Sequence, residues 1–351
     1  MRLKNLSSYD KRKKDLIRNP KNWLITGVAG FIGSSLLETL LDLGQTVIGI
    51  DNFSISDDSN LLSVQNTAGL NWSNFTFYEG DIRNLDDCLK GCKNADYVLH
   101  QAALGSVPRS IADPVCTNDS NINGFLNMLL AVKSSDVKRF VYAASSSTYG
   151  DHPDLPKTEK RIGRPLSPYA ITKFVNELYA EVFSKIYGIE TIGLRYFNVF
   201  GPRQSSEGAY SAVIPKWINS LLSGNTCSIN GDGTTSRDFC YIDNVVQANI
   251  LAATTTNKES INQVYNIAYG GSTTLNELFE LLVQNISKNN FKIINKEPHF
   301  NNFRTGDVLH SLADITKAKR LLGFNPSHTA KEGLENTVNW FVEHSNCKLE
   351  S

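Results

Sequence analysis

The segment Thr26-Gly27-Val28-Ala29-Gly30-Phe31-Ile32-Gly33 is the most informative glycine-rich part of the chain. A short apolar run that predicts a strand precedes it, and an apolar stripe with helical spacing follows it. Gly27 permits a tight turn, Gly30 lets the backbone approach a phosphate, and Gly33 lets the helix pack closely on the strand. A helix N-terminus also attracts anions through its free N–H groups. The segment therefore predicts a dinucleotide-binding turn, with a plain strand-to-helix turn as the alternative.

Beyond this segment, apolar runs alternate with helical patterns through the first 200 residues, beginning with a helix expected at Phe31–Leu43. Strands are expected at Trp23–Thr26, Thr46–Ile50, Phe75–Tyr78, Tyr97–His100, Phe140–Ala143 and Thr191–Tyr196. Continuous apolar strands separated by helices are typical of a parallel sheet covered on both faces. We therefore predict an α/β fold: a doubly wound, parallel Rossmann-type sheet with a smaller C-terminal α/β substrate lobe.

The expected organisation has three parts and a discontinuous boundary. Residues 1–20 form a basic N-terminal extension, 21–200 the dinucleotide-binding domain with return segments near 235–268, and 201–345 mainly the substrate lobe. A strand near Val264–Ile267 is expected to return to the sheet. The lobe's shorter helices are expected at Leu275–Ile286, Ile315–Leu322 and Glu332–His344.

The composition excludes several classes of protein. The chain has 351 residues with Lys+Arg 35 and Asp+Glu 35, and this balance argues against a general nucleic-acid binder. Hydrophobic residues at 41% exclude a disordered chain, and no apolar run approaches the ~18 residues of a membrane span. The basic N-terminus is interpreted as a solvated tail or an outer helix, and no apolar stretch follows it, so we expect a cytoplasmic protein. Cys88 and Cys92 lack further ligands at suitable spacing, so no metal site is expected.

Acidic and small residues follow the next strand ends. Asp51 ends the second strand, where a carboxylate accepts the ribose hydroxyls of an adenosine and repels a 2′-phosphate. No Lys or Arg stands between Asn52 and Asn60 to bind such a phosphate, so NAD is favoured over NADP. Asp81-Ile82 closes the third strand, where an adenine would lie, and Gln101-Ala102-Ala103 closes the fourth with room for a cofactor. A loop or capping carboxylate is the alternative for Asp51.

A candidate catalytic group follows in Tyr169-Ala170-Ile171-Thr172-Lys173, which places a phenol and an ammonium on one helix face. The ordinary pKa of tyrosine is about 10, and a neighbouring cation lowers it, so Tyr169 can serve as a base. The fifth strand ends in the serines Ser145–Ser147, at the sheet edge that faces a ligand, where a hydroxyl stabilises a developing carbonyl oxygen. A chance Tyr/Lys pair and a polar turn are the alternatives.

Taken in order, these motifs resemble the extended short-chain dehydrogenase/reductase superfamily and, within it, the nucleotide-sugar 4-epimerases. The resemblance covers roughly residues 20 to 345 and is specific because many motifs occur in the family's order. It is carried by the opening glycine motif and by Gly80–Arg83, His100–Ala103, Ser145–Gly150, Tyr169–Lys173, Arg195–Gln204, Gly231–Gly233, Arg237–Phe239 and Arg304–Val308.

The resemblance implies roles for the residues at matching positions. It implies Tyr169 as the catalytic base, Lys173 as the group that holds the ribose and tunes the tyrosine, and Ser145 as their hydroxyl partner. NAD would be held by Gly27, Gly30, Phe31, Ile32, Gly33, Asp51, Asn52, Phe53, Ser54, Asp81, Ile82, Gln101, Ala102, Ala103, Tyr169, Lys173, Tyr196, Asn198 and Val199. The substrate would contact Gly105, Ser106, Ser145, Ser146, Tyr169, Asn198, Gln204, Arg237, Arg304, Asp307 and Ser311. A surface arginine without a ligand is the alternative for Arg237 and Arg304.

The residues after Ser145 separate related activities. The family's 4,6-dehydratases carry Asp-Glu there and its decarboxylases usually a Glu two positions on, whereas this chain has Ser146-Ser147. The resemblance therefore implies epimerisation at C4 of a UDP-hexose through a 4-keto sugar, with NAD regenerated in each turnover. A sister dehydratase or reductase and a non-catalytic dinucleotide sensor are the alternatives.

Substrate size depends on Ser311, which aligns with a tyrosine often found in glucose-type epimerases. A small residue leaves room for a 2-acetamido group. Together with the serines at 145–147 and Gly105-Ser106, Ser311 resembles the pattern of epimerases that prefer UDP-N-acetylglucosamine or its uronic acid. A UDP-glucose/galactose 4-epimerase is the alternative. Thr305 and Phe239 depart from the family's usual Pro and Tyr, which bears on uridine binding. The resemblance also implies a homodimer, with helices near Asn118–Ser134 and Pro168–Tyr187 as its candidate faces.

Overall fold

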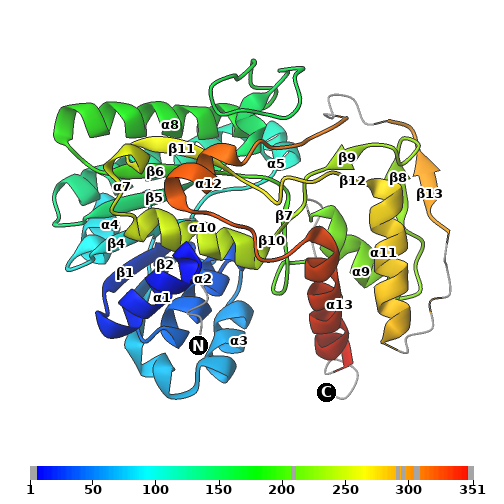
Figure 1. Ribbon diagram of the computed structural model, residues 1–351, viewed down its shortest axis with the longest axis horizontal. Coiled ribbons are helices and arrows are strands. Elements are labelled where there is room, and N and C mark those ends of the chain that lie inside the picture. Colours follow the sequence, from blue (N-terminus) through cyan, green and yellow to red (C-terminus); the bar gives the residue numbers. More distant parts are fainter. Residues whose placement is uncertain (1–5, 207–210, 290–292, 294–296, 304–308, 347–351) are drawn as a thin grey trace.

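A seven-stranded parallel sheet lies at the centre of the molecule (Figure 1). The computed structural model describes residues 6–206, 211–289, 293, 297–303 and 309–346. Within these residues the strand order is β11-β6-β5-β4-β1-β2-β3, and every neighbouring pair is parallel. The strands are β1 (Asn22–Thr26), β2 (Thr46–Asp51), β3 (Phe75–Glu79), β4 (Tyr97–His100), β5 (Arg139–Ser145), β6 (Thr191–Tyr196) and β11 (Gln263–Ile267). The predicted doubly wound α/β class is confirmed.

The strand order reverses at β1, which lies between β2 and β4. Thr26 at the end of β1 is paired with Ile50 and with His100, so these three strands end almost level. Open parallel sheets bind ligands in the crevice outside such a reversal point, at the carboxyl ends of the strands. The topology therefore directs attention to the loops after β1, β2, β4 and β5.

Helices cover both faces of the sheet, which explains the continuous apolar strands. Trp23 and Ile25 of β1 enter one core cluster and Leu24 between them enters another, and all three are fully buried. The helices are α1 (Ser8–Arg18), α2 (Phe31–Asp42), α3 (Ser59–Ala68), α4 (Leu85–Cys92), α5 (Val107–Ala112), α6 (Pro114–Asn118), α7 (Gly124–Lys133), α8 (Pro168–Tyr187), α9 (Val213–Leu222), α10 (Ile242–Thr254), α11 (Leu275–Lys288), α12 (Thr316–Leu322) and α13 (Ala330–Asn346). Shorter turns are η1 (Gly69–Asn74), η2 (Asp119–Asn123, a π-helix), η3 (Ser146–Tyr149) and η4 (Lys258–Ser260).

β5 is longer than the sequence predicted, since it begins at Arg139 and runs on to Ser145. A charged residue argues against a buried strand, but Arg139 is almost fully buried here with its charge paired. Its guanidinium donates to Glu190 over 2.7 Å and to the carbonyl of Ala252 over 3.0 Å. These partners are far away in the sequence, so the local pattern does not reveal them.

The smaller lobe is built from α9, α11, α13 and short strand pairs, and it lies to one side of the sheet in Figure 1. β13 (His299–Asn301) pairs with β8 (Ser228–Asn230), and β12 (Thr273–Thr274) with β9 (Ser236–Arg237). β7 (Val199–Phe200) and β10 (Cys240–Tyr241) form a third pair between the lobe and the sheet. The three-part domain division stays a prediction.

The basic N-terminal segment contains a helix, α1, that packs against α10 on the outside of the sheet. Leu16 is its buried anchor, and Gln45 ties the helix end to the strand by donating to the Leu16 carbonyl and accepting from the Lys21 N–H. In the part of the chain that the structure describes, no helix has the length and apolar character needed to cross a membrane.

Candidate active site

The glycine-rich turn leaves no space for side chains where β1 passes into α2. Gly27 has a φ of +71°, and a Cβ atom there would lie 2.7 Å from the backbone nitrogen of Ala102. A Cβ on Gly33 would lie 2.0 Å from the Gly27 carbonyl oxygen. Gly30 caps α2 without a side chain, so the N–H groups of the first helical turn face outward. This cradle fits the phosphates of a dinucleotide, with Phe31 and Ile32 in the first turn beside them.

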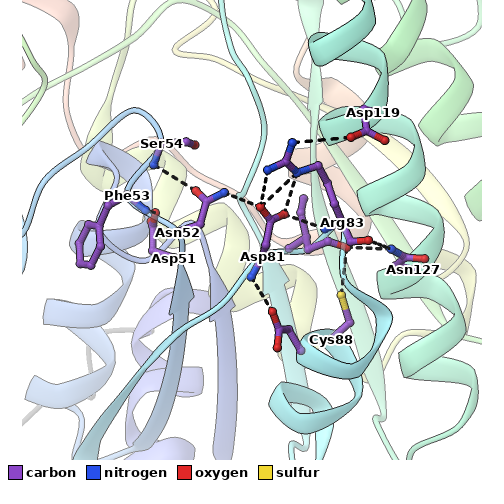
Figure 2. A network of polar contacts seen from close by, with 11 residues as sticks. Asp51, Asn52, Phe53, Ser54, Asp81, Arg83, Cys88, Asp119 and Asn127 are labelled. Atoms are coloured by element: carbon purple, nitrogen blue, oxygen red, sulfur yellow. Dashed lines mark hydrogen bonds and ion pairs between the residues drawn. The ribbon is translucent and has the colours of Figure 1, made fainter.

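Asp51 stands at the end of β2 beside this turn (Figure 2). Its carboxylate accepts the backbone N–H groups of Ala29 and Phe53, each over 3.0 Å. Burial raises the pKa of Asp51, and these hydrogen bonds act against that rise. Each carboxylate oxygen has a further lone pair for a ribose hydroxyl, so the residue fits the predicted role. Phe53, with a φ of +53°, and Ser54 complete the turn after the strand.

A polar network joins the ends of β2 and β3, as Figure 2 shows. Asn52 donates to Asp81 over 2.8 Å, and Arg83 binds the same carboxylate through Nε at 3.1 Å and an NH2 group at 2.7 Å. The Arg83 hydrogen bond lowers the pKa of Asp81 to about 2. Arg83 also approaches Asp119 of η2 at 3.6 Å. The sequence analysis quoted Arg83 only as the end of the Gly80–Arg83 motif and gave it no role, because its partners come together only in the folded chain.

The three predicted catalytic residues meet at the carboxyl end of β5. Ser167 caps α8 by accepting the Ala170 N–H over 3.1 Å, which places Tyr169 in the first turn and Lys173 one turn later. The Lys173 ammonium lies 5.9 Å from the centroid of the Tyr169 ring and donates to the Ala143 carbonyl over 2.8 Å. Ser145 approaches Tyr169 from the strand side closely enough to lower the pKa of the tyrosine.

Burial controls the protonation of this group. It raises the pKa of Tyr169, and the hydrogen bond with Ser145 acts in the opposite direction. Burial also lowers the pKa of Lys173 to about 8, so the ammonium is still charged at neutral pH. An ionised phenol can exchange a proton with a bound hydroxyl, and a nearby cation favours the ionised form.

Two further predicted cofactor residues, Tyr196 and Gln101, are hydrogen-bonded to each other. The Tyr196 hydroxyl donates to Gln101 over 3.1 Å, and Asn249 of α10 donates to that hydroxyl over 2.9 Å. Gln101 in turn donates to Asn249 over 3.2 Å. The buried Tyr196 therefore holds Gln101 at the sheet edge, beside Ala102 and Ala103. Asn249 was missed in the sequence, where it occurs within an unremarkable helical pattern.

The loop after β4 is fixed by a buried asparagine. Asn121 in the π-helix η2 accepts the Leu104 N–H over 2.7 Å and donates to Thr172 of α8 over 3.1 Å. The Asn121 side chain therefore links the loop that contains Gly105 and Ser106 to α8, the helix that carries Tyr169 and Lys173. Ser106, with a φ of +96°, caps α5, and Gly105 is exposed.

The candidate substrate residues of the smaller lobe lie on neighbouring segments. Arg237 of β9 donates to the carbonyls of Ser236 and Leu309, both over 3.0 Å. The Ser311 N–H donates to the Ser236 carbonyl over 3.1 Å, so Ser311 lies beside the same strand. Asn198, with a φ of +33°, donates to the Asp238 carbonyl over 3.1 Å.

Asp238 organises this region, a role that the sequence did not indicate. Its fully buried carboxylate accepts backbone N–H groups from Tyr269, Gly270 and Ala313 at 3.1 to 3.2 Å. Burial raises its pKa to about 6 against the effect of these hydrogen bonds. The residue therefore ties β9, which bears Arg237, to the segment that bears Ser311.

The remaining expectations are placed as follows. Gln204 donates to the carbonyl of Val199, which lies on β7, and Ser146 opens η3. Ile82 is buried behind Asp81. Arg304 and Asp307 lie outside the described residues. Among the described residues no group of three or more His, Cys, Asp or Glu side chains is arranged to hold a metal ion.

Comparison with known proteins identifies the family. Residues 23–268 match the NAD dependent epimerase/dehydratase family. The chain is 35% identical to a UDP-glucuronate 4-epimerase of Thermodesulfobacterium geofontis, over 92% of this chain and 96% of that protein. A solved UDP-N-acetylglucosamine 4-epimerase of Methanobrevibacter ruminantium, in complex with UDP-N-acetylmuramic acid, is 38% identical over 93% of this chain and 99% of that one, with a TM-score of 0.83. A UDP-glucuronic acid 4-epimerase of Bacillus cereus, solved with UDP-glucuronic acid and NAD, is 31% identical over 92% and 99% of the chains, with a TM-score of 0.81.

The buried ammonium of Lys173 predicts a pH-dependent stability difference. Its pKa is about 8 in the folded protein and 10.5 ordinarily, so between these values the folded chain has released a proton that the unfolded chain still holds. The unfolding free energy of the wild type should therefore rise relative to that of Lys173→Met as the pH increases through this window, by about 3 kcal/mol. Urea denaturation of both proteins at several pH values measures the difference. Parallel pH curves for the two proteins would contradict the assignment.

Proposed function

The chain belongs to the NAD dependent epimerase/dehydratase family, and we propose that it is a UDP-sugar 4-epimerase that prefers N-acetylated hexoses. The proposed substrates are UDP-N-acetylglucosamine and UDP-N-acetylgalactosamine or their uronic acids. The observation that carries the reaction is that Ser145, Tyr169 and Lys173 come together at the end of β5, at the same sheet edge as the glycine-rich turn.

NAD, when bound, accepts the hydride from C4 of the sugar and returns it within the same turnover. The residues proposed to hold it are those of the glycine cradle, Asp51 with the turn after β2, the ends of β3 and β4, and Lys173. The cradle and the Asp51 carboxylate fit this cofactor, because small residues meet the phosphates and an acid meets an unphosphorylated ribose.

Side chains of the protein carry out the proton transfer. Tyr169 takes the proton from the C4 hydroxyl while the C4–H bonding pair leaves as hydride, which yields a 4-keto sugar. Ser145 donates a hydrogen bond to the carbonyl oxygen as it forms, and the Lys173 ammonium stabilises the tyrosine in its ionised form. After the sugar turns over in the pocket, the hydride returns to the opposite face of C4 and Tyr169 gives back the proton. The net reaction is inversion of configuration at C4, with no net oxidation of the sugar.

Residues of the smaller lobe are proposed to hold the UDP group. Arg237 suits a diphosphate because a guanidinium pairs with phosphate oxygens as a planar fork, and Asn198 lies on the adjoining segment. Gly105, Ser106, Ser146 and Gln204 are proposed sugar contacts. Arg304 and Asp307 are carried over from the family resemblance alone.

The preference for an acetylated sugar rests on Ser311. A serine fills far less of a pocket than the tyrosine of glucose-type epimerases, so a 2-acetamido group has room. The similarity to a UDP-N-acetylglucosamine 4-epimerase supports the acetylated sugar, and the similarity to UDP-glucuronate 4-epimerases supports a uronic acid. UDP-glucose/galactose epimerisation is the second candidate.

Two properties of the proposed enzyme follow from its surface and its thiols. We propose a homodimer through α8, because Ile171, Leu178, Val182 and Ile186 are each 46–65% exposed along that helix. The neighbouring α5 and α6 add exposed Ile111 and Val115. A cytoplasmic location is supported by unpaired cysteines at positions 88, 92, 116, 227 and 240, which suit a reducing compartment.

The proposed reaction predicts the outcome of a substrate panel. UDP-N-acetylglucosamine, its uronic acid, UDP-glucose and their galacto isomers are incubated singly with the enzyme, and NMR resolves the products. Interconversion of isomers, fastest for an acetylated pair, is expected, and Tyr169→Phe should lower kcat by about 10²- to 10⁴-fold. Loss of water from the sugar or stoichiometric NADH release would favour a sister enzyme instead.

If the small side chain of Ser311 leaves the space for the 2-acetamido group, and so acts as a size gate, a larger residue at this position should change substrate specificity. Ser311→Tyr should reduce kcat/KM for the acetylated substrate about tenfold or more, because the ring occupies the space of the acetamido group. Turnover of UDP-glucose by the same variant is the internal control and should be spared. Equal losses on both substrates would refute a gate at this position.

If α8 forms the dimer interface, charged substitutions on its exposed apolar face should lower the molecular mass of the protein in solution. Leu178→Glu combined with Val182→Glu places two charges on the α8 face and should yield monomers in light scattering. Leu70→Glu is the control, since Leu70 is 94% exposed on η1 away from α8 and its variant should stay dimeric. A wild-type protein that is monomeric at micromolar concentration would overturn the proposal.

A further inference from the structure

The catalytic hydroxyl of Ser145 is held by a second serine. β5 ends at Ser145, which caps the short helix η3, and the backbone N–H of Ser147 donates to Ser145 Oγ over 3.1 Å. Ser147 Oγ donates to the same oxygen over 2.9 Å. One side chain therefore receives two hydrogen bonds from one neighbour, through the backbone and through the hydroxyl.

The direction of the Ser145 proton follows from the capacity of a hydroxyl. A serine oxygen carries one proton and two acceptor lone pairs. Both lone pairs of Ser145 are engaged by Ser147, so Ser145 has no acceptor left for the Tyr169 hydroxyl. Any hydrogen bond that Ser145 makes with Tyr169, or with a substrate oxygen held between them, is then donated by the serine.

We propose that Ser147 is a positioning residue that makes Ser145 an obligate donor toward Tyr169 and the reacting oxygen at C4. This inference rests on the proposed epimerase function. In the substrate-free enzyme the donated bond favours the ionised phenol. During the reaction the same proton points at the oxygen on which negative charge develops.

The consequence for catalysis can be followed through the Ser147→Ala variant. Removal of Ser147 Oγ frees one lone pair of Ser145, while the backbone bond from residue 147 remains. Ser145 can then accept a hydrogen bond from Tyr169, which stabilises the protonated phenol in place of the phenolate. The acid limb of the pH profile of kcat should therefore move to higher pH.

The competing role for Ser147 is direct contact with the sugar. Ser147 is half-buried in the same serine run, and Ser146 beside it is a proposed substrate residue. A sugar contact would act mainly on KM and would not require Ser145. A residue that acts through Ser145 changes kcat and loses its effect once Ser145 is gone.

Four variants separate these roles: Ser147→Ala, Ser147→Thr, Ser145→Ala and the double alanine variant. Ser147→Ala should lower kcat about 3- to 30-fold at neutral pH with KM unchanged, and Ser147→Thr, which keeps the hydroxyl, should restore activity. In the Ser145→Ala background the second substitution should add no further loss. A raised KM, an unshifted pH profile, or full additivity of the two losses would overturn the proposal.

A measurement without turnover keeps this test separate from the proposed function. Tyrosinate absorbance of the NAD-loaded protein, taken as a difference from Tyr169→Phe, reports the ionisation of Tyr169. Ser147→Ala should move that titration to higher pH, and unchanged titration would contradict the Ser147 role. A wild-type enzyme that interconverts no UDP-sugar would refute the proposed function, while the absorbance titration would still decide the role of Ser147.

Discussion

The ammonium group of Lys173 is buried at the end of β5, and the arrangement of the candidate site follows from how it is held there. Lys173 is 4% exposed, and its Nζ has the Ala143 carbonyl as a hydrogen-bond acceptor at the end of β5. Burying a lysine without a carboxylate partner costs stability, because the charged form prefers water. The Lys173 ammonium lies 5.9 Å from the centroid of the Tyr169 ring, where its charge is proposed to act on the phenol and on NAD. Burial of the ammonium lowers the pKa of Lys173.

The parallel sheet makes this arrangement possible. Strands β1, β2, β4 and β5 end at the same edge, so the glycine turn, Asp51, Gln101 and Ser145 converge although long stretches of chain separate them. α8 then returns across this edge with Tyr169 and Lys173 on the face toward β5. Buried polar links such as Asn121 and Asp238 fix the surrounding loops, because each satisfies several backbone groups at once. The smaller lobe is thereby held against the sheet in a defined position.

Much of this could be predicted from the sequence, since its strongest signals are local. The glycine spacing between β1 and α2, the apolar strands and the Tyr/Lys spacing on α8 each depend on residues a few positions apart. The ends of β4 and β6 were predicted to the residue, and β11 returns to the sheet where the sequence indicated. What could not be predicted depends on partners far apart in the chain. Arg139 extends β5 through Glu190 and Ala252, Asn249 joins Tyr196 to Gln101, and Asp238 joins three segments. The roles of Arg304 and Asp307 lie outside the described residues and rest on family resemblance.

In the proposed reaction one carbon of the sugar loses a hydride and regains the same hydride on its other face. A UDP-hexose that the enzyme turns over, carrying deuterium at C4, tests this transfer in ordinary water. The C4 epimer is expected to retain the deuterium at C4, as resolved by NMR and mass spectrometry, with none released to solvent. Appearance of the label in water, or its replacement by solvent hydrogen at C4, would contradict it.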